Sequence, residues 1–188
     1  MEFDEAVEKR RSVRNFRDKK VKWDDVMEAV DAATKAPFAG NIDDLKFIVI
    51  EDKQMIGKIA HLCQQKWVGE AGVVVVVCSD NRQMINLYGE RGKIYSRQGA
   101  GAAIENFLLK LADIGLSGCW IGAFSDEMVE QLLKIPSHMR IEAVIPVGYE
   151  RLKTKVPRKK KLENVIYWEM WGNGKRQDLK RMKEPATW

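Results

Sequence analysis

Apolar positions along the chain follow two spacings, which predict separate helical and extended segments. Trp23, Val26, Met27, Val30 and Ala33 recur every three or four positions with acidic residues between them, as on the buried face of a helix. Unbroken apolar runs of strand length predict buried strands instead. Helices are therefore expected over about 2–11, 23–36, 55–67, 100–114 and 126–135, and strands over 45–51, 73–78, 118–124 and 141–148.

The order of these segments indicates an α+β protein with four or five strands and at least five helices. A chain of 188 residues, of which 45% are hydrophobic, is long enough for one domain with a sizeable core. Because helices and strands alternate in places, a parallel, doubly wound sheet remains open as the alternative. The polar stretch 81–98 fits a mobile helix or a flap, and Gly115 is expected to cap the helix over 100–114.

Composition narrows the functional classes. Cys63, Cys78 and Cys119 lie in apolar contexts without a C-x-x-C pattern, as expected for buried thiols in a reduced, cytoplasmic protein. His61 and His138 have no ligand-type spacing, so neither a metal site nor a Ser-His-Asp triad is predicted. No apolar run approaches the length needed to span a membrane, and the acidic N-terminal segment lacks the features of a signal peptide.

The net charge of +5 is concentrated toward the C-terminal end. Residues 151–188 contain 12 lysines and arginines against 4 acidic residues, whereas residues 1–150 contain 20 against 23. Such a segment suits nucleic acid, an anionic cofactor or solubility alone. The run Arg158-Lys159-Lys160-Lys161 has no interleaved aromatic residue and no DNA-binding motif beside it, so nucleic acid is the weakest of these interpretations.

A second basic cluster, Arg10-Arg11-Ser12-Val13-Arg14, follows the first amphipathic segment. Its three guanidinium groups and one hydroxyl match the shape and charge of a phosphate group. The alternative is a solvated helix end, where cations complement the helix dipole. The glycines of Gly99-Ala100-Gly101-Ala102-Ala103 do not predict a rival phosphate turn, because no strand leads into them; close helix packing is expected there instead.

Five motifs, in the same order, resemble the nitroreductase-like family of FMN-dependent oxidoreductases. The resemblance spans roughly residues 3–168, and the motifs are Arg10-Arg11-Ser12-Val13-Arg14 with Phe16, Ala36-Pro37-Phe38-Ala39-Gly40-Asn41, Ala103-Ile104-Glu105-Asn106-Phe107-Leu108-Leu109, Gly115-Leu116-Ser117-Gly118-Cys119-Trp120-Ile121-Gly122, and Pro146-Val147-Gly148-Tyr149 followed by Pro157-Arg158-Lys159-Lys160. Each motif alone is short. Five in register are specific, and they favour the phosphate interpretation of residues 10–14.

The resemblance implies a phosphate clamp built from both ends of the chain. A dianionic phosphate needs several donors to offset its desolvation. Arg10, Ser12 and Arg14 would hold the FMN phosphate and ribityl chain, with Arg11 flanking them. Arg158 and Lys160 would reach the same phosphate from the far end of the sequence. The two ends of the chain are therefore expected to meet, within one subunit or across a dimer.

The resemblance also implies contacts to the flavin ring. Asn41 suits the ring edge because an amide both donates and accepts hydrogen bonds. Ile121 and Gly122 would lie near the isoalloxazine, where glycine permits close backbone approach. The flavin would carry the chemistry, so no catalytic side chain is nominated.

The family's architecture implies a mostly antiparallel sheet of four to five strands flanked by helices, in a homodimer whose C-terminal segments are exchanged. The flavin would lie at the dimer interface. Residues 1–168 are expected to form the FMN-binding domain, and residues 169–188 an extension that packs on the partner subunit. The apolar helix over 100–114 and the aromatic residues from Tyr167 to Trp171 fit this arrangement.

The chain departs from the family pattern after Asn41. The family commonly continues with x-Gln-Pro-Trp, whereas this chain has Ile42-Asp43-Asp44-Leu45, and Phe38 replaces a small polar residue. Two acids near a flavin would disfavour its anionic reduced form by Coulomb repulsion. The alternative is that both carboxylates point to solvent.

The function implied by the resemblance is a ping-pong reaction in which NAD(P)H reduces FMN, which then reduces a small organic acceptor such as a nitroaromatic or a quinone. Residues from the stretch 81–95 are expected on the acceptor side. Three alternatives are other flavin chemistry in the same family (flavin cleavage or reductive dehalogenation), non-catalytic FMN binding, and nucleic-acid binding through the basic tail.

Overall fold

The computed structural model describes residues 1–155 and 159–174. Among these residues, no helix is both long enough and apolar enough to cross a membrane. In chain order the elements are α1 (Phe3–Lys9), α2 (Trp23–Thr34), η1 (Ala39–Asn41), β1 (Leu45–Ile50), α3 (Lys53–Leu62), η2 (Lys66–Glu70), β2 (Val73–Ser79), α4 (Arg82–Tyr88), α5 (Glu90–Asp113), β3 (Ser117–Gly118), α6 (Asp126–Leu133), β4 (Arg140–Gly148) and η3 (Leu162–Asn164), where η marks a 3-10 helix.

Four strands form one sheet in the order β1-β2-β4-β3, and every neighbouring pair is antiparallel. Strand β2 pairs with β1 along its length, with Val49 opposite Val75. A shift between Val77 and Cys78 interrupts its register with β4. The pairing confirms the predicted α+β class with a mostly antiparallel sheet and excludes the parallel, doubly wound alternative.

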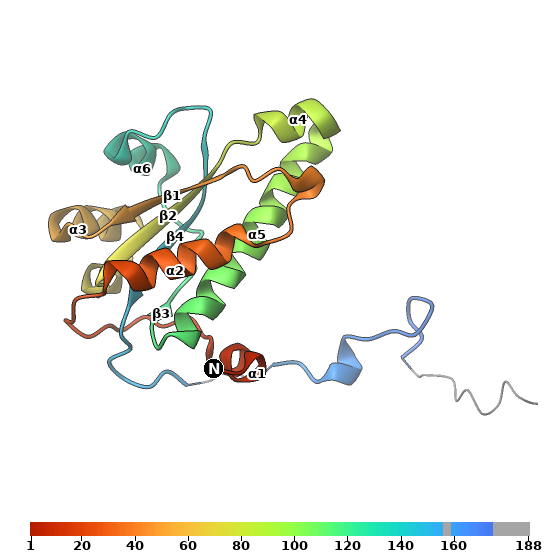
Figure 1. Cartoon of the computed structure of the whole chain (residues 1–188), viewed down its shortest axis with the longest axis horizontal. Helices are drawn as coiled ribbons and strands as arrows, with labels where there is room; N and C mark the ends of the chain where they lie inside the picture. The colour runs from red at the N-terminus through yellow and green to blue at the C-terminus, as the bar shows by residue number, and fades with distance from the viewer. Residues whose placement is uncertain (156–158, 175–188) are drawn as a thin grey trace, which may run out of the picture. The chain divides into compact units, whose positions relative to one another are not determined.

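Strand β2 is buried over its whole length because helices cover both faces of the sheet. Successive strand side chains point to opposite faces. Val73 and Val75 therefore enter a core shared with α2 and α5, whereas Val74 and Val76 pack with residues of α3, η2 and α6. Figure 1 shows α2 and α5 lying alongside each other, with α3 and α6 grouped away from them. The buried strand predicted over 73–78 is confirmed.

Helix α5 differs most from the sequence-based expectation. The sequence predicts its start near residue 100 and a flap over 81–98, but α4 and the first turns of α5 occupy that stretch. Gly89, with φ 59°, joins the two helices. The buried positions at this end of α5 include Gly92, Ser96 and Gly99. Because these residues are small or polar, they do not produce the apolar periodicity by which a buried helix face is recognised.

Two further segments are shorter than predicted. Helix α3 ends at Leu62 rather than near residue 67, because Gln64 adopts a left-handed φ of 55° and η2 follows. The strand expected over 118–124 reduces to β3 and an isolated bridge between Ile121 and Val144. The cap predicted at Gly115 is confirmed by its φ of 80°.

The chain divides into two units, Met1–Thr154 and Lys155–Trp188. The first contains the whole sheet and helices α1 to α6. The second contains η3 and a turn in which the ring centroids of Tyr167 and Trp171 are 4.7 Å apart. The domain boundary expected after residue 168 stays a prediction.

Candidate functional site

The basic segment at residues 10–14 lies beside strand β3. The backbone N–H of Val13 donates to the carbonyl of Gly118 at 3.1 Å, and Ser12 forms a parallel bridge with Gly118. The Val13 side chain is only 1% exposed and packs in the core, whereas Ser12 and Arg14 are exposed. Alternation along an extended segment accounts for this, since Ser12 and Arg14 share the face opposite Val13.

Two of the three arginines in this segment are paired with carboxylates. Arg10 Nε lies 2.9 Å from Glu105 Oε1, and Arg11 Nη2 lies 3.1 Å from Glu150 Oε2. Burial favours a higher pKa for Glu150, but hydrogen bonds from Arg11 and Thr154 hold that pKa below its usual value. Arg11 therefore ties the segment to the end of β4, and its charge is partly neutralised.

Ser12 and Arg14 lie next to the buried thiol of Cys119. Burial raises the pKa of Cys119, and the Arg14 charge, with hydrogen bonds from Ser12 and Arg14, partly offsets that rise. Within the described part of the chain, Arg14 has no carboxylate partner. One exposed hydroxyl and one exposed, uncompensated guanidinium thus share a face, and this donor set fits an anionic group such as phosphate.

At Ile121 and Gly122 the chain presents backbone rather than side chains. Ile121 is 3% exposed and exchanges backbone hydrogen bonds of 3.0 and 3.1 Å with Val144, so its side chain belongs to the core. Gly122 is exposed, and a Cβ added there would meet no atom of the described residues within 4 Å. Packing in the free chain therefore does not require glycine at 122, which is compatible with a position reserved for a ligand.

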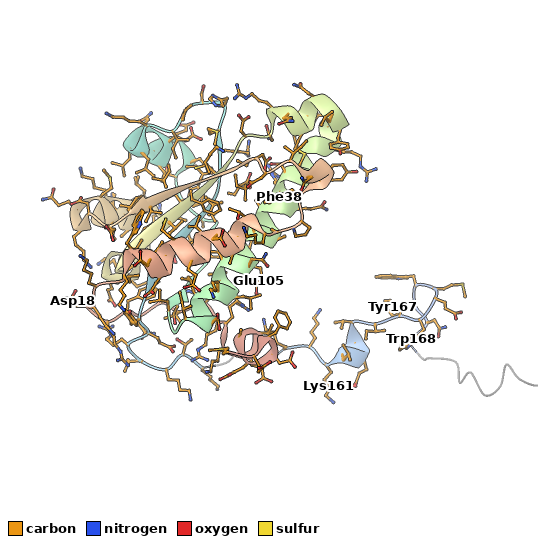
Figure 2. The ribbon with its side chains drawn as sticks, in the orientation of Figure 1. Asp18, Phe38, Glu105, Lys161, Tyr167 and Trp168 are labelled. Carbon is orange, nitrogen blue, oxygen red and sulfur yellow. The ribbon has the colours of Figure 1, made fainter. Side chains whose placement is uncertain are left out.

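Asn41 belongs to the tight turn η1, which packs against α5 at a different point along that helix from Gly118. It is exposed, with φ 56°, directly after Gly40 with φ 59°. The Phe38 ring of this turn comes within 2.9 Å of where a Gly99 Cβ would lie, whereas Gly118 packs on Leu111. Twelve helical residues span about 18 Å. Figure 2 shows Phe38 near the α4 end of α5 and Glu105 further along that helix. The structure thus groups the segments around Ser12 and Gly122 but leaves Asn41 well apart from them.

The C-terminal half of the predicted clamp stays a prediction. Arg158 lies outside the described residues. Lys160 is described and exposed, but it belongs to the unit that begins at Lys155, and the two units are described separately.

Asp44 is a buried polar group whose environment the sequence did not indicate. Asp44 is 6% exposed. Ser96 Oγ donates to Asp44 Oδ2 at 2.5 Å, and Asp44 Oδ1 has no hydrogen-bond partner among the described residues. Burial raises the pKa of Asp44, and the charges of Asp43 and Glu142 raise it further. The alternative that both acids point to solvent therefore holds only for Asp43. Ser96 is 52 residues away, and no local pattern links it to Asp44.

Comparison with known proteins decides the family. The model of the Nitroreductase family matches residues 7–67 and 56–149, which together span most of the chain. The chain belongs to the nitroreductase family. The resemblance drawn from its five motifs is therefore confirmed.

Similar proteins include an iodotyrosine deiodinase from Thermotoga neapolitana, 26% identical over 171 residues, which cover 82% of this chain and 92% of that protein. An FMN reductase (NAD(P)H) from Bacillus subtilis is 26% identical over 155 residues, which cover 74% of this chain and 62% of that protein. A nitroreductase family protein from Streptococcus pneumoniae has a crystal structure that matches with a TM-score of 0.80 and 25% identity, over 89% of this chain and all of that one. Oxidoreductases of the nitroreductase type are thus this chain's relatives.

Proposed function

We propose that this member of the nitroreductase family is an FMN-dependent NAD(P)H oxidoreductase that reduces a small organic acceptor, such as a nitroaromatic or a quinone. The observation that carries the proposal is the hydrogen bond from Val13 to Gly118, which places Ser12 and Arg14 beside the segment that leads to Gly122. The name of the Bacillus subtilis relative supports both FMN and NAD(P)H as the molecules involved.

Each polar residue of the segment 10–14 has a distinct role in the proposed phosphate site. Ser12 and Arg14 bind the phosphate directly, because neither is paired with a carboxylate in the part of the chain that the structure describes. Arg10 turns from Glu105 toward the phosphate when the cofactor binds. Arg11 remains on Glu150 and holds the segment in place while adding positive potential. Arg158 and Lys160 complete the clamp from the C-terminal unit.

The flavin ring is proposed to lie over the backbone at Ile121 and Gly122, with the Asn41 amide at the ring edge. When bound, FMN supplies hydride transfer from NAD(P)H to the acceptor in two alternating half-reactions. The chain binds and orients both reactants there, and solvent provides the proton.

The proposal includes a homodimer in which the C-terminal segments are exchanged. The α5 residues beside the two segments, Gly99 and Leu111, are about 18 Å apart along the helix. A second subunit therefore provides a way to bring an Asn41 side chain to each phosphate site. Large apolar side chains on the first unit, Phe3, Val7 and Trp120, are exposed and suit such an interface.

Reductive dehalogenation is a second candidate for the acceptor half-reaction. It is favoured by one observation, the similarity to an iodotyrosine deiodinase over 82% of this chain. The proposed FMN site is the same in both cases, and only the acceptor differs.

Turnover by the purified protein tests these functions. With FMN bound, excess FMN removed and oxygen excluded, we expect sustained NADH or NADPH oxidation, beyond one equivalent per flavin, only when an acceptor is present, with parallel lines in double-reciprocal plots. A nitroaromatic and a quinone should serve as acceptors, and release of iodide from an iodophenol would favour the second candidate. Absence of NAD(P)H oxidation with all three acceptors would contradict the proposed function.

A further inference from the structure

An aromatic cluster with one unpaired cation lies where α4 meets α5. The rings of Tyr88 and Tyr95 pack edge to face with centroids 5.3 Å apart, and the Arg91 guanidinium lies 5.8 Å from the centroid of Tyr95. Glu90, the neighbouring acid, pairs with Lys93 at 2.8 Å. Over the described ranges, Arg91 has no carboxylate partner. Its positive charge is therefore available to a ligand that meets the rings.

This cluster adjoins the turn that carries Asn41. The Tyr88 hydroxyl lies 2.7 Å from where a Cβ on Gly40 would stand, so a side chain at 40 would collide with it. On the other flank of the turn, the Phe38 ring fills the space over Gly99. Tyr88 thus contacts the turn that carries the exposed Asn41, and Phe38 of the same turn packs on α5. Because Asn41 is proposed to contact the edge of the flavin bound by the partner subunit, the cluster would lie beside the partner's ring in the proposed homodimer.

The helices that carry the cluster are fixed tightly against each other. A Cβ on Gly92 would lie 2.3 Å from the carbonyl oxygen of Met84, so α4 and α5 make backbone contact. Gly89 supplies the positive φ that this sharp connection requires. The hydrogen bond between Ser96 and Asp44 anchors the same end of α5 to the start of β1. The backbone positions that carry the two rings and Arg91 are therefore fixed relative to one another before a ligand binds.

We propose that Tyr88, Arg91 and Tyr95 form the acceptor-recognition surface and select planar aromatic molecules that carry a carboxylate. Aromatic rings pack offset or edge to face on other rings, and a guanidinium fork matches a carboxylate in shape and charge. Tyr88 is 39% exposed, and Leu87 of α4 and Ile94 of α5 are exposed apolar residues of the same two helices. This inference rests on the proposed function, because it takes the molecule bound here to be the acceptor.

Binding of two unreactive probes of equal shape tests the inference directly. We expect calorimetry on the full-length protein with FMN added to show benzoate binding about tenfold more tightly than benzamide, since only benzoate offers a charged partner to Arg91. Arg91→Gln should reduce this ratio to about one, and Arg91→Lys should restore part of it. Arg97→Gln is the matched control, because Arg97 is an exposed cation of the same helix with no ion pair inside the described segments, and its ratio should equal that of the wild type.

A second variant separates the ring from the charge. Tyr95→Leu should weaken both probes by a similar factor and leave their ratio near that of the wild type, because it removes the stacking partner and keeps Arg91. In turnover assays, 4-nitrobenzoate should show a lower KM than 4-nitrobenzamide, and Arg91→Gln should abolish the difference.

Equal binding of benzoate and benzamide to the wild type, or equal effects of Arg91→Gln and Arg97→Gln, would overturn the inference while leaving NAD(P)H turnover intact. Failure of the proposed function has a different signature, which is no NAD(P)H oxidation with any acceptor. The calorimetric ratio is measured without turnover, so it decides the inference in either case.

Discussion

The backbone amide of Val13 donates a hydrogen bond to the carbonyl of Gly118, 3.1 Å away, and thereby joins the N-terminal basic segment to the strand that leads to Gly122. Strand alternation then turns Val13 into the core and leaves Ser12 and Arg14 facing outward. The proposed cofactor site depends on this backbone contact between two residues that are far apart in the sequence.

Arg14→Gln should weaken FMN binding by about 1.5–3 kcal/mol, because it removes a charged donor from the proposed phosphate contact. Riboflavin, which lacks the phosphate, should bind the variant and the wild type equally. Titration monitored by flavin fluorescence measures both affinities. Lys20→Gln, a change of an exposed cation on the following loop, serves as the control. An equal loss for FMN and riboflavin would show that Arg14 does not contact the phosphate.

Glu105→Gln should strengthen FMN binding, because Arg10 would no longer be held by a carboxylate 2.9 Å from its Nε. The ion pair is partly exposed, so the expected gain is modest, about 0.2–1 kcal/mol. The same fluorescence titration detects it as an increase in affinity of up to about fivefold. Weaker binding by this variant would instead show that Glu105 positions Arg10 for the cofactor.

Substitution by alanine should affect FMN binding at Gly122 and the stability of the fold at Gly118. A Cβ on Gly122 meets no atom within 4 Å, so Gly122→Ala should leave the free energy of unfolding within about 0.5 kcal/mol of the wild type and yet weaken FMN binding. A Cβ on Gly118 would lie 3.1 Å from Leu111 Cδ1 and 3.3 Å from the Pro146 carbonyl oxygen, so Gly118→Ala should destabilise the fold by about 1–3 kcal/mol. Urea unfolding and FMN titration together separate the two effects. Undiminished FMN affinity in Gly122→Ala would place the ring elsewhere.

The sequence predicted the sheet better than the helix that borders the site. The strands over 73–78 and 141–148 were predictable because continuous apolar runs of that length require burial on both faces. The first turns of α5 were not, because Gly92 and Ser96 occupy buried positions where a periodic pattern needs large apolar residues. Close contact of helix backbones selects small residues, and small residues carry no hydrophobic signal.

The candidate site was predictable in its residue types but not in its pairings. The cluster of Arg10, Ser12 and Arg14 was visible because all its members are local. The pairing of Arg11 with Glu150, 139 residues away, depends on where β4 ends and has no local pattern. The contact of Arg10 with Glu105 likewise follows from how α5 lies in the fold. Only the structure therefore separates the exposed, unpaired Arg14 from its two paired neighbours.

Asp44→Asn should stabilise the protein at neutral and alkaline pH. Burial raises the pKa of Asp44 in the folded state above the ordinary value of 3.8. Protonated Asp44 therefore makes its full contribution to the free energy of unfolding below pH 3.8. This contribution is lost as the pH rises through the pKa of the folded state. The neutral amide avoids the buried charge, so its Tm should exceed that of the wild type by roughly 2–6 °C at pH 8, and the two should converge toward pH 4.

Calorimetric scans of the wild type and Asp44→Asn between pH 4 and pH 8 measure this difference. Asp18→Asn, a change of an exposed carboxylate, is the control and should show no comparable rise. A Tm gap that widened toward acid pH would mean that the folded state favours the charged carboxylate, contrary to this account.

The most direct measurement of the central claim is the flavin content of the purified protein before and after incubation with FMN. The account predicts a flavin absorption spectrum, and FMN released on heat denaturation in an amount close to one molecule per chain. A colourless protein that binds neither its own nor added FMN would contradict the claim that residues 10–14 and the strand leading to Gly122 form a cofactor site.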